Sequence, residues 1–169
     1  MVESIDLALD EFGTVPNVEY VSFHLGENEN NALRIIDKIR GIGKKAGVVL
    51  NLSTDVRKLL PLLCFDELDS VMLMGIHPGV LKQQSRPELV VKKLQEIAPL
   101  IEGKRCAEFI QVDGGVTFET VPHLVKAGAT NMICGSSTLY RGVSFSDDWA
   151  QISTKVSENY NAVRTALDR

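Results

Sequence analysis

Segments with a helical pattern alternate with segments that have a strand pattern along the whole chain, and this alternation limits the folds open to it. Five short runs are rich in apolar or β-favouring residues, and six segments carry helix signals. We expect strands over 20–25, 47–52, 70–76, 109–112 and 131–134, and helices over 4–12, 30–45, 54–63, 87–101, 117–128 and 147–167. Strands that alternate with helices imply right-handed βαβ crossovers and one parallel sheet.

The length of 169 residues sets how large this parallel sheet can be. No linker or low-complexity tract divides the chain, so we expect a single domain over 1–169. A closed eight-stranded βα barrel usually takes about 250 residues and at least about 200. The pattern alone therefore leaves two architectures, an open doubly wound sheet and part of a βα barrel.

Charge and hydropathy exclude several classes of partner. The net charge is −4, so we expect no nucleic acid and no anionic membrane as a partner. No apolar run reaches the ~18 residues of a membrane span, and the N-terminal segment has no basic region typical of a signal peptide. Cys64, Cys106 and Cys134 lie far apart in the sequence, and we expect reduced core thiols in a cytoplasmic protein.

The sharpest motif is Asp113-Gly114-Gly115, which comes where the fourth expected strand ends. In βα barrels this end of a strand carries the chemistry, and two glycines leave amide groups free to approach an anion near a helix N-terminus. The alternative is an ordinary turn with an aspartate before glycines. The next strand also runs into a Gly/Ser turn, Gly135-Ser136, and two successive turns of this kind resemble the phosphate site of many βα barrels.

Two histidines and a glycine-rich stretch need separate interpretation. His77 follows an expected strand and could be a ligand, an acid–base group or a satisfied polar residue; for His24 the structural interpretation is favoured. The stretch Gly41 to Gly47 does not match a dinucleotide fingerprint, because it ends a helix and precedes a strand.

In order and spacing, these motifs resemble the ribulose-5-phosphate 3-epimerase family of ketose-phosphate 3-epimerases. The matching pieces are Val21-Ser22-Phe23-His24, Asn51-Leu52-Ser53-Thr54, the strand Met72 to Ile76 with His77-Pro78-Gly79, Val112 to Val116, Ala127-Gly128-Ala129 and Cys134-Gly135-Ser136. The resemblance implies a ribulose-phosphate-binding (βα)8 TIM barrel. This chain would supply its C-terminal part, with about five strands and six helices.

The resemblance also implies a reaction and a set of site residues. The family interconverts D-ribulose 5-phosphate and D-xylulose 5-phosphate through an enediolate, with a divalent metal (Zn, Fe or Mn) across two substrate oxygens. Asp113 matches a carboxylate that is both an acid–base group and a metal ligand. On the substrate and phosphate side, the matching or candidate residues are Gly114, Gly115, Gly135, Ser136, Met74 and His77.

The resemblance places the start of the chain inside the third strand of the family's barrel, ahead of which the family carries its second acid–base Asp and two metal-binding His. The family's Phe-Gly-Gly-Gln loop reads Val80-Leu81-Lys82-Gln83 here. The alternative function is therefore an inactive phosphosugar-binding or oligomerising remnant, and open strand edges favour a homo-oligomer. Relatives of orotidine-phosphate decarboxylase would need a lysine at a strand end, and the sequence offers none.

Overall fold

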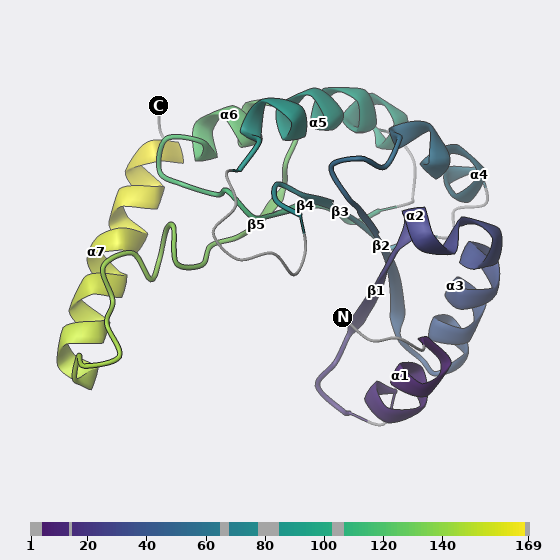
Figure 1. The fold of residues 1–169 in the computed structure, drawn as a ribbon, viewed down its shortest axis with the longest axis horizontal. Helices are drawn as coiled ribbons and strands as arrows, with labels where there is room; N and C mark the ends of the chain where they lie inside the picture. Colours follow the sequence, from purple (N-terminus) through teal and green to yellow (C-terminus); the bar gives the residue numbers. More distant parts are fainter. Residues whose placement is uncertain (1–4, 14, 65–67, 78–84, 103–106, 168–169) are drawn as a thin grey trace.

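Five parallel strands form one sheet in the computed structural model, which describes residues 5–13, 15–64, 68–77, 85–102 and 107–167. The strands lie in chain order, each paired with the next (Figure 1). They are β1 (Tyr20–His24), β2 (Lys45–Leu50), β3 (Ser70–Met74), β4 (Phe109–Asp113) and β5 (Asn131–Ile133). The expectation of about five parallel strands in an incomplete βα barrel is confirmed.

Every segment expected to be helical contains a helix. These are α1 (Ile5–Phe12), α3 (Ala32–Gly41), η2 (Val56–Leu59) with α4 (Leu60–Leu63), α5 (Pro87–Ile101), α6 (Val121–Lys126) and α7 (Trp149–Leu167). Two further turns, α2 (Leu25–Asn28) and η1 (Glu29–Asn31), join β1 to α3. They are too short to show the apolar periodicity on which the expectation rested.

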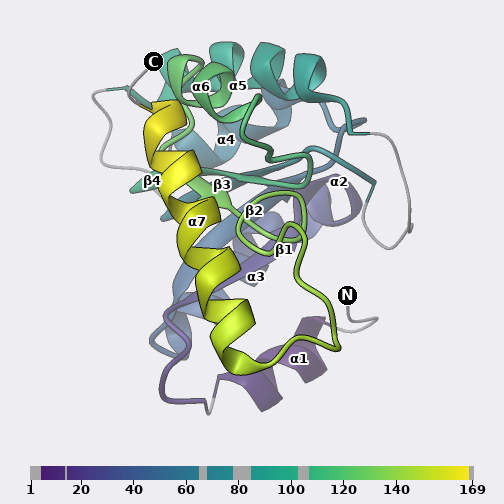
Figure 2. The same cartoon turned by 90° about the vertical axis from the view of Figure 1, so that its left-hand side faces the viewer.

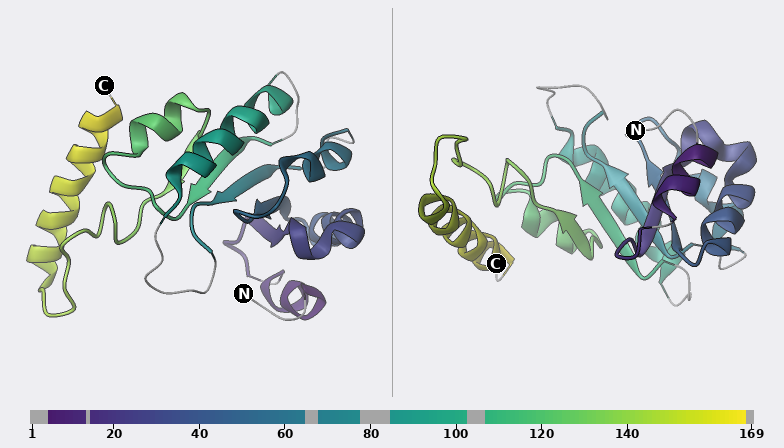
Figure 3. Two further views of the ribbon diagram at one scale, coloured as in Figure 1. Left: turned by 45° about the horizontal axis from the view of Figure 1, so that its top comes forward. Right: turned by 90° about the horizontal axis from the view of Figure 1, so that it is seen from below.

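The sheet curves into an arc, and helices α3 to α6 run along its convex side (Figures 1 and 3). Alternation along β4 shows the consequence, because Ile110 and Val112 are buried while Gln111 and Asp113 are half-buried. The buried side chains of α3 and α5 pack on this convex side; they include Ile36, Ile39, Leu94 and Ile97, which are fully buried. The core thus lies between sheet and helices, and the other face of β4 carries the polar side chains.

Helix α7 lies at one end of the arc, beyond β5 (Figures 1 and 2). It contacts α6, and Val163 and Ala166 are its buried residues, whereas Trp149 at its start is largely exposed. No helix among the described residues is long and apolar enough to cross a membrane.

Local details differ from the sequence expectations at two places. The helix expected from residue 54 begins at Val56 with Asp55 as its cap, because the Asp55 carboxylate accepts the Arg57 amide at 2.8 Å, while Thr54 is buried. Cys64 is exposed at the end of α4 and is not a core thiol; Cys134 is half-buried and Cys106 lies outside the described residues. The glycine cap after α3 is confirmed, since Gly43 has φ of 74° just beyond the helix.

Helix α6 also begins later than expected, at Val121. Thr117 forms a turn ahead of it, in which its amide donates to Thr120 Oγ1 at 2.8 Å and its own Oγ1 accepts from the Thr120 amide at 3.2 Å. The N-cap of α6, Thr120, still lies next to the glycine turn, since its Oγ1 donates to the Gly115 carbonyl at 3.0 Å.

Candidate functional site

The carboxyl ends of the five strands meet at one edge of the sheet, because all strands are parallel. The register pairs Met74, the last residue of β3, with Asp113, the last residue of β4. Just past these ends, the Gly75 amide donates to the Asp113 carbonyl at 2.7 Å. Two of the predicted site residues are therefore direct neighbours, on the side of the sheet opposite the helices.

The Asp113 side chain is available for chemistry. It is half-buried, and among the described residues no hydrogen bond or ion pair reaches its carboxylate. Met74 beside it is nearly buried, which gives the carboxylate an apolar neighbour. A carboxylate with a free acceptor side at a strand end can take a proton from a bound ligand.

Gly114 and Gly115 form a turn that only glycine can make here. Their φ angles are 91° and 71°, in the left-handed region. A Cβ on Gly115 would lie 2.5 Å from Ser85 Cβ, and one on Gly114 would lie 2.6 Å from Ile76 Cγ1. A hydrogen bond also stabilises the turn, since Thr120 Oγ1 donates to the Gly115 carbonyl at 3.0 Å.

The second predicted turn, Gly135-Ser136, follows β5, which pairs with β4 through Asp113 and Ile133. The Gly135 carbonyl accepts the amides of Thr138 at 3.0 Å and Tyr140 at 3.1 Å, which closes a compact turn. Ser136 is exposed, and nothing lies within 4 Å of the position where a Gly135 Cβ would be. This turn therefore keeps open space at its glycine, as a phosphate-binding backbone requires.

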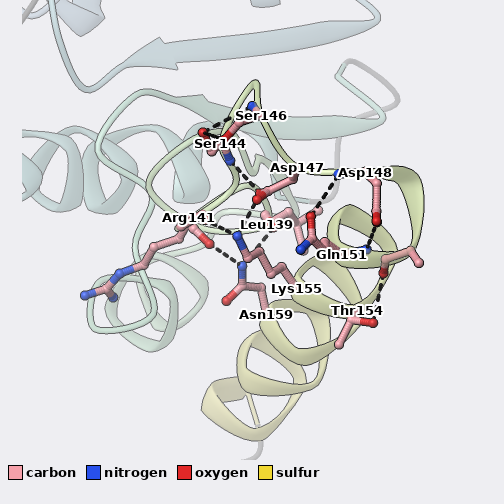
Figure 4. Close-up of polar contacts among 12 residues, drawn as sticks. Leu139, Arg141, Ser144, Ser146, Asp147, Asp148, Gln151, Thr154, Lys155 and Asn159 are labelled. Carbon is pink, nitrogen blue, oxygen red and sulfur yellow. Dashed lines mark hydrogen bonds and ion pairs between the residues drawn. The ribbon is translucent and has the colours of Figure 1, made fainter.

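Helix α7 holds the segment that follows this turn (Figure 4). The Asn159 amide group donates to the carbonyls of Leu139 at 3.0 Å and Arg141 at 2.9 Å. Lys155, one turn earlier on the helix, donates to the Asp147 carboxylate at 2.7 Å and the Gly142 carbonyl at 2.9 Å. The pKa of Asp147 lies below its usual value because Lys155 and a backbone amide stabilise the charged form.

The two histidines differ in their surroundings. His77 is exposed and lies three residues beyond β3, so it is near this edge of the sheet. His24, the last residue of β1, is half-buried, and its buried Nδ1 has no hydrogen-bond partner among the residues that the structure describes. Pro78, Gly79 and the loop residues Val80 to Gln83 lie outside the described residues.

Metal ligands do not gather in the described part of the chain. Within those ranges, no group of three or more His, Cys, Asp or Glu side chains could hold a metal ion. Asp113 alone does not fit the set that a divalent metal needs, so the expected metal site at Asp113 stays a prediction.

Two polar residues at the same edge were not predicted as site residues, although Asn51 begins one of the motifs that match the family. Asn51 follows β2 directly, and its buried Oδ1 also lacks a partner within the described ranges. Lys93 of α5 donates to the carbonyls of Asn51 at 2.7 Å and Thr54 at 2.6 Å, and burial lowers its pKa. A strand-end position is a usable signal for Asn51. No sequence signal links it to Lys93, which lies 42 residues further on.

The sequence is similar to a known family along most of its length. A family model described as the ribulose-phosphate 3 epimerase family matches residues 1–139. A ribulose-phosphate 3-epimerase of Methanocaldococcus jannaschii is 34% identical over 137 residues, covering 81% of this chain and 56% of the relative. One from Bacillus subtilis is 39% identical over 105 residues, covering 62% of this chain and 47% of the relative. The chain spans about half the length of the curated relatives it matches.

A solved structure supports the fold independently. The crystal structure of a 3-hexulose-6-phosphate synthase superposes with a TM-score of 0.60 over 96% of this chain and 66% of that protein. The sequence identity is 14%, so this likeness concerns the fold alone.

Proposed function

The chain belongs to the ribulose-phosphate 3-epimerase family, and on that premise we propose that its strand-end site binds a pentulose phosphate and exchanges the proton at C3. The substrates are D-ribulose 5-phosphate and D-xylulose 5-phosphate. The observation that carries the proposal is the Asp113 carboxylate, which has no partner among the described residues and lies between Met74 and the two glycine turns.

The phosphate binds at the glycine turns after β4 and β5. The backbone of Gly115 and Gly135 can approach a phosphate closely, since neither carries a side chain, and Ser136 adds an exposed hydroxyl. His77 is placed to contribute a further polar contact from the end of β3. With the phosphate held there, the sugar carbons extend along the strand ends toward Asp113 and Met74.

Asp113 then acts as the acid–base group on one face of the sugar. Its carboxylate takes the proton from C3 as the C3–H bond breaks, and the electron pair forms the enediolate with the C2 carbonyl. Return of a proton from the same side regenerates the starting sugar. Inversion requires a second acid–base group on the opposite face. Of the last residues of the five strands, Asp113 is the only one that carries a carboxylate.

A divalent metal, by resemblance to the family, would stabilise the charge that develops on the enediolate oxygens. The described residues do not supply its ligand set, so the steps assigned to Asp113 are written without the metal.

Proton exchange at C3 tests the proposal directly, because it detects abstraction even without inversion. The C3–H signal of ribulose 5-phosphate should disappear in D₂O in the presence of the folded chain with Zn²⁺, Fe²⁺ or Mn²⁺. Asp113→Asn should abolish the exchange without changing the melting curve, since the side chain makes no described bond. Equal exchange by the variant, or none by a folded wild type, would contradict the acid–base role.

Binding without turnover is the second candidate function. Two observations on the described residues favour it: the candidate phosphate-binding residues Gly115, Gly135 and Ser136 are present, but the strand ends offer one carboxylate, whereas inversion needs two acid–base groups. A rise in melting temperature with ribulose 5-phosphate but no C3 exchange would support it.

A further inference from the structure

Two buried polar atoms at the edge of the sheet have no hydrogen-bond partner in the described part of the chain. Among the described residues, His24 Nδ1 and Asn51 Oδ1 are the two buried side-chain nitrogen or oxygen atoms without a hydrogen-bond partner. Folded proteins pair nearly all such atoms, because an unpaired one loses its bonds to water. A pair of exceptions at a site edge therefore indicates groups whose partner arrives with a ligand.

The two residues lie on adjacent parallel strands, and His24 is in register with Val49, two residues before Asn51. His24 ends β1 and Asn51 follows the last residue of β2, the adjacent parallel strand. The loops that come next are also in contact, since a Cβ on Gly26 would lie 2.9 Å from Thr54 Oγ1. Continuing the β2–β3 register by one residue sets Asn51 opposite Met74, in the row that contains Asp113.

Lys93 fixes the backbone of Asn51. Its ammonium donates to the Asn51 carbonyl at 2.7 Å and to the Thr54 carbonyl at 2.6 Å. The Thr54 amide donates to the same Asn51 carbonyl at 3.0 Å, so this main-chain oxygen accepts two hydrogen bonds. The side-chain Oδ1 remains the free acceptor of Asn51, on a backbone that is held in place.

We propose that Asn51 and His24 bind the hydroxyl groups of the sugar chain while the phosphate occupies the glycine turns. Asn51 Oδ1 accepts a hydrogen bond from one hydroxyl, and His24 Nδ1 forms a hydrogen bond with a second hydroxyl. Two strand spacings, about 10 Å, separate the end of β2 from the turn after β4, a span that a five-carbon phosphate ester with hydrogen bonds at both ends can bridge. The inference rests on the proposed function and adds the residues that select a polyol over a bare phosphate. Lys93 is a positioning residue in this arrangement.

Calorimetric titration of the full chain with ribulose 5-phosphate and with inorganic phosphate separates the two ends of the site. Asn51→Leu removes the orphan acceptor at similar volume, so the melting temperature should stay or rise. Its affinity for ribulose 5-phosphate should fall roughly tenfold, as for one lost hydrogen bond, while its affinity for inorganic phosphate stays within about twofold. His24→Phe should behave in the same way. Ser53→Ala, at an exposed neighbouring position, is the matched control and should bind like the wild type.

Lys93→Met provides the positioning test, and Met keeps most of the stem. The variant should have a lower affinity for ribulose 5-phosphate and an unchanged affinity for inorganic phosphate. An equal loss of affinity for both ligands would mean a merely structural role. If Asn51→Leu binds ribulose 5-phosphate with the same affinity as the wild type, the hydroxyl assignment is overturned and the proposed function remains intact. No binding of ribulose 5-phosphate by the wild type would overturn both.

Discussion

Gly75→Ala tests whether close backbone contact at the strand ends holds the site together. A Cβ on Gly75 would lie 2.1 Å from the Gly114 carbonyl oxygen and 3.0 Å from its carbon. Both partners are backbone, so the two strand ends must separate by roughly 1 Å to reach ordinary van der Waals distance. The hydrogen bond from the Gly75 amide to the Asp113 carbonyl, 2.7 Å long, spans the same gap and would lengthen.

The expected cost follows from these two effects. Overpacking costs about 1–3 kcal/mol and a lost neutral hydrogen bond about 0.5–1.5 kcal/mol. A less flexible unfolded chain offsets about 0.4–1 kcal/mol of this. We therefore expect the free energy of unfolding to fall by about 1–4 kcal/mol, which lowers the urea midpoint by roughly 1 M for a chain of this size.

Gly41→Ala is the matched control. Gly41 ends α3, has an ordinary φ, and nothing lies within 4 Å of its Cβ position. The same chemical change there should leave stability unchanged or raise it by up to about 1 kcal/mol. If Gly75→Ala and Gly41→Ala unfold at the same urea concentration, the contact between the strand ends does not constrain the site as argued.

Three further predictions concern the turns and their support. Asp147→Asn should lower the free energy of unfolding, measured with urea at neutral pH. The difference in this free energy from the wild type should shrink as the pH falls below about 4. The reason is that the pKa of Asp147 is lowered in the folded protein, so its carboxylate contributes stability above its unfolded pKa and loses this contribution on protonation. A difference as large at pH 3 as at pH 7 would contradict the ion pair with Lys155. Asn159→Leu should lower the affinity for inorganic phosphate measured by calorimetry, whereas Asn161→Leu, at an exposed position, should not. Equal affinities of the two variants would show that Asn159 does not support the Gly135 turn. Gly115→Ala should cost about 1–2 kcal/mol in urea unfolding from its left-handed backbone alone; an unchanged midpoint would refute that conformation.

The five parallel strands could be predicted because the apolar runs are short, separate and each followed by a helical pattern, whereas their order in the sheet was left open by the pattern and implied only by the family resemblance. The helix over Pro87–Ile101 has the same bounds in the sequence expectation and in the structure, because a proline start and apolar spacing mark it. The start of α6 could not be predicted, since Thr117 and Thr120 bond to each other and form a separate turn first. Local side-chain bonds of this kind compete with helix formation and are hard to weigh from sequence.

The site was predicted in part for a similar reason. Asp113 and its glycines stand next to one another in the chain, so their pattern is visible in sequence. The clamp of Lys93 on Asn51 joins residues on different elements, and only folding brings them together. The orphan state of His24 Nδ1 is likewise a property of its packing, and the residue type alone favoured a structural role.

The consecutive order of the strands bears on how the chain unfolds. Within the described sheet, each strand pairs with its neighbours in sequence, so this sheet is a linear series of similar units, as in repeat proteins. In such a series the interior units are braced on both sides and the terminal ones on one. We expect amide hydrogen exchange to be slowest in β2 and β3, where nearly every residue is buried, and fastest at β5, which has three residues. The glycine turn after β5 therefore sits on the unit that opens most readily, and a phosphate bound there would slow exchange at that end of the sheet first.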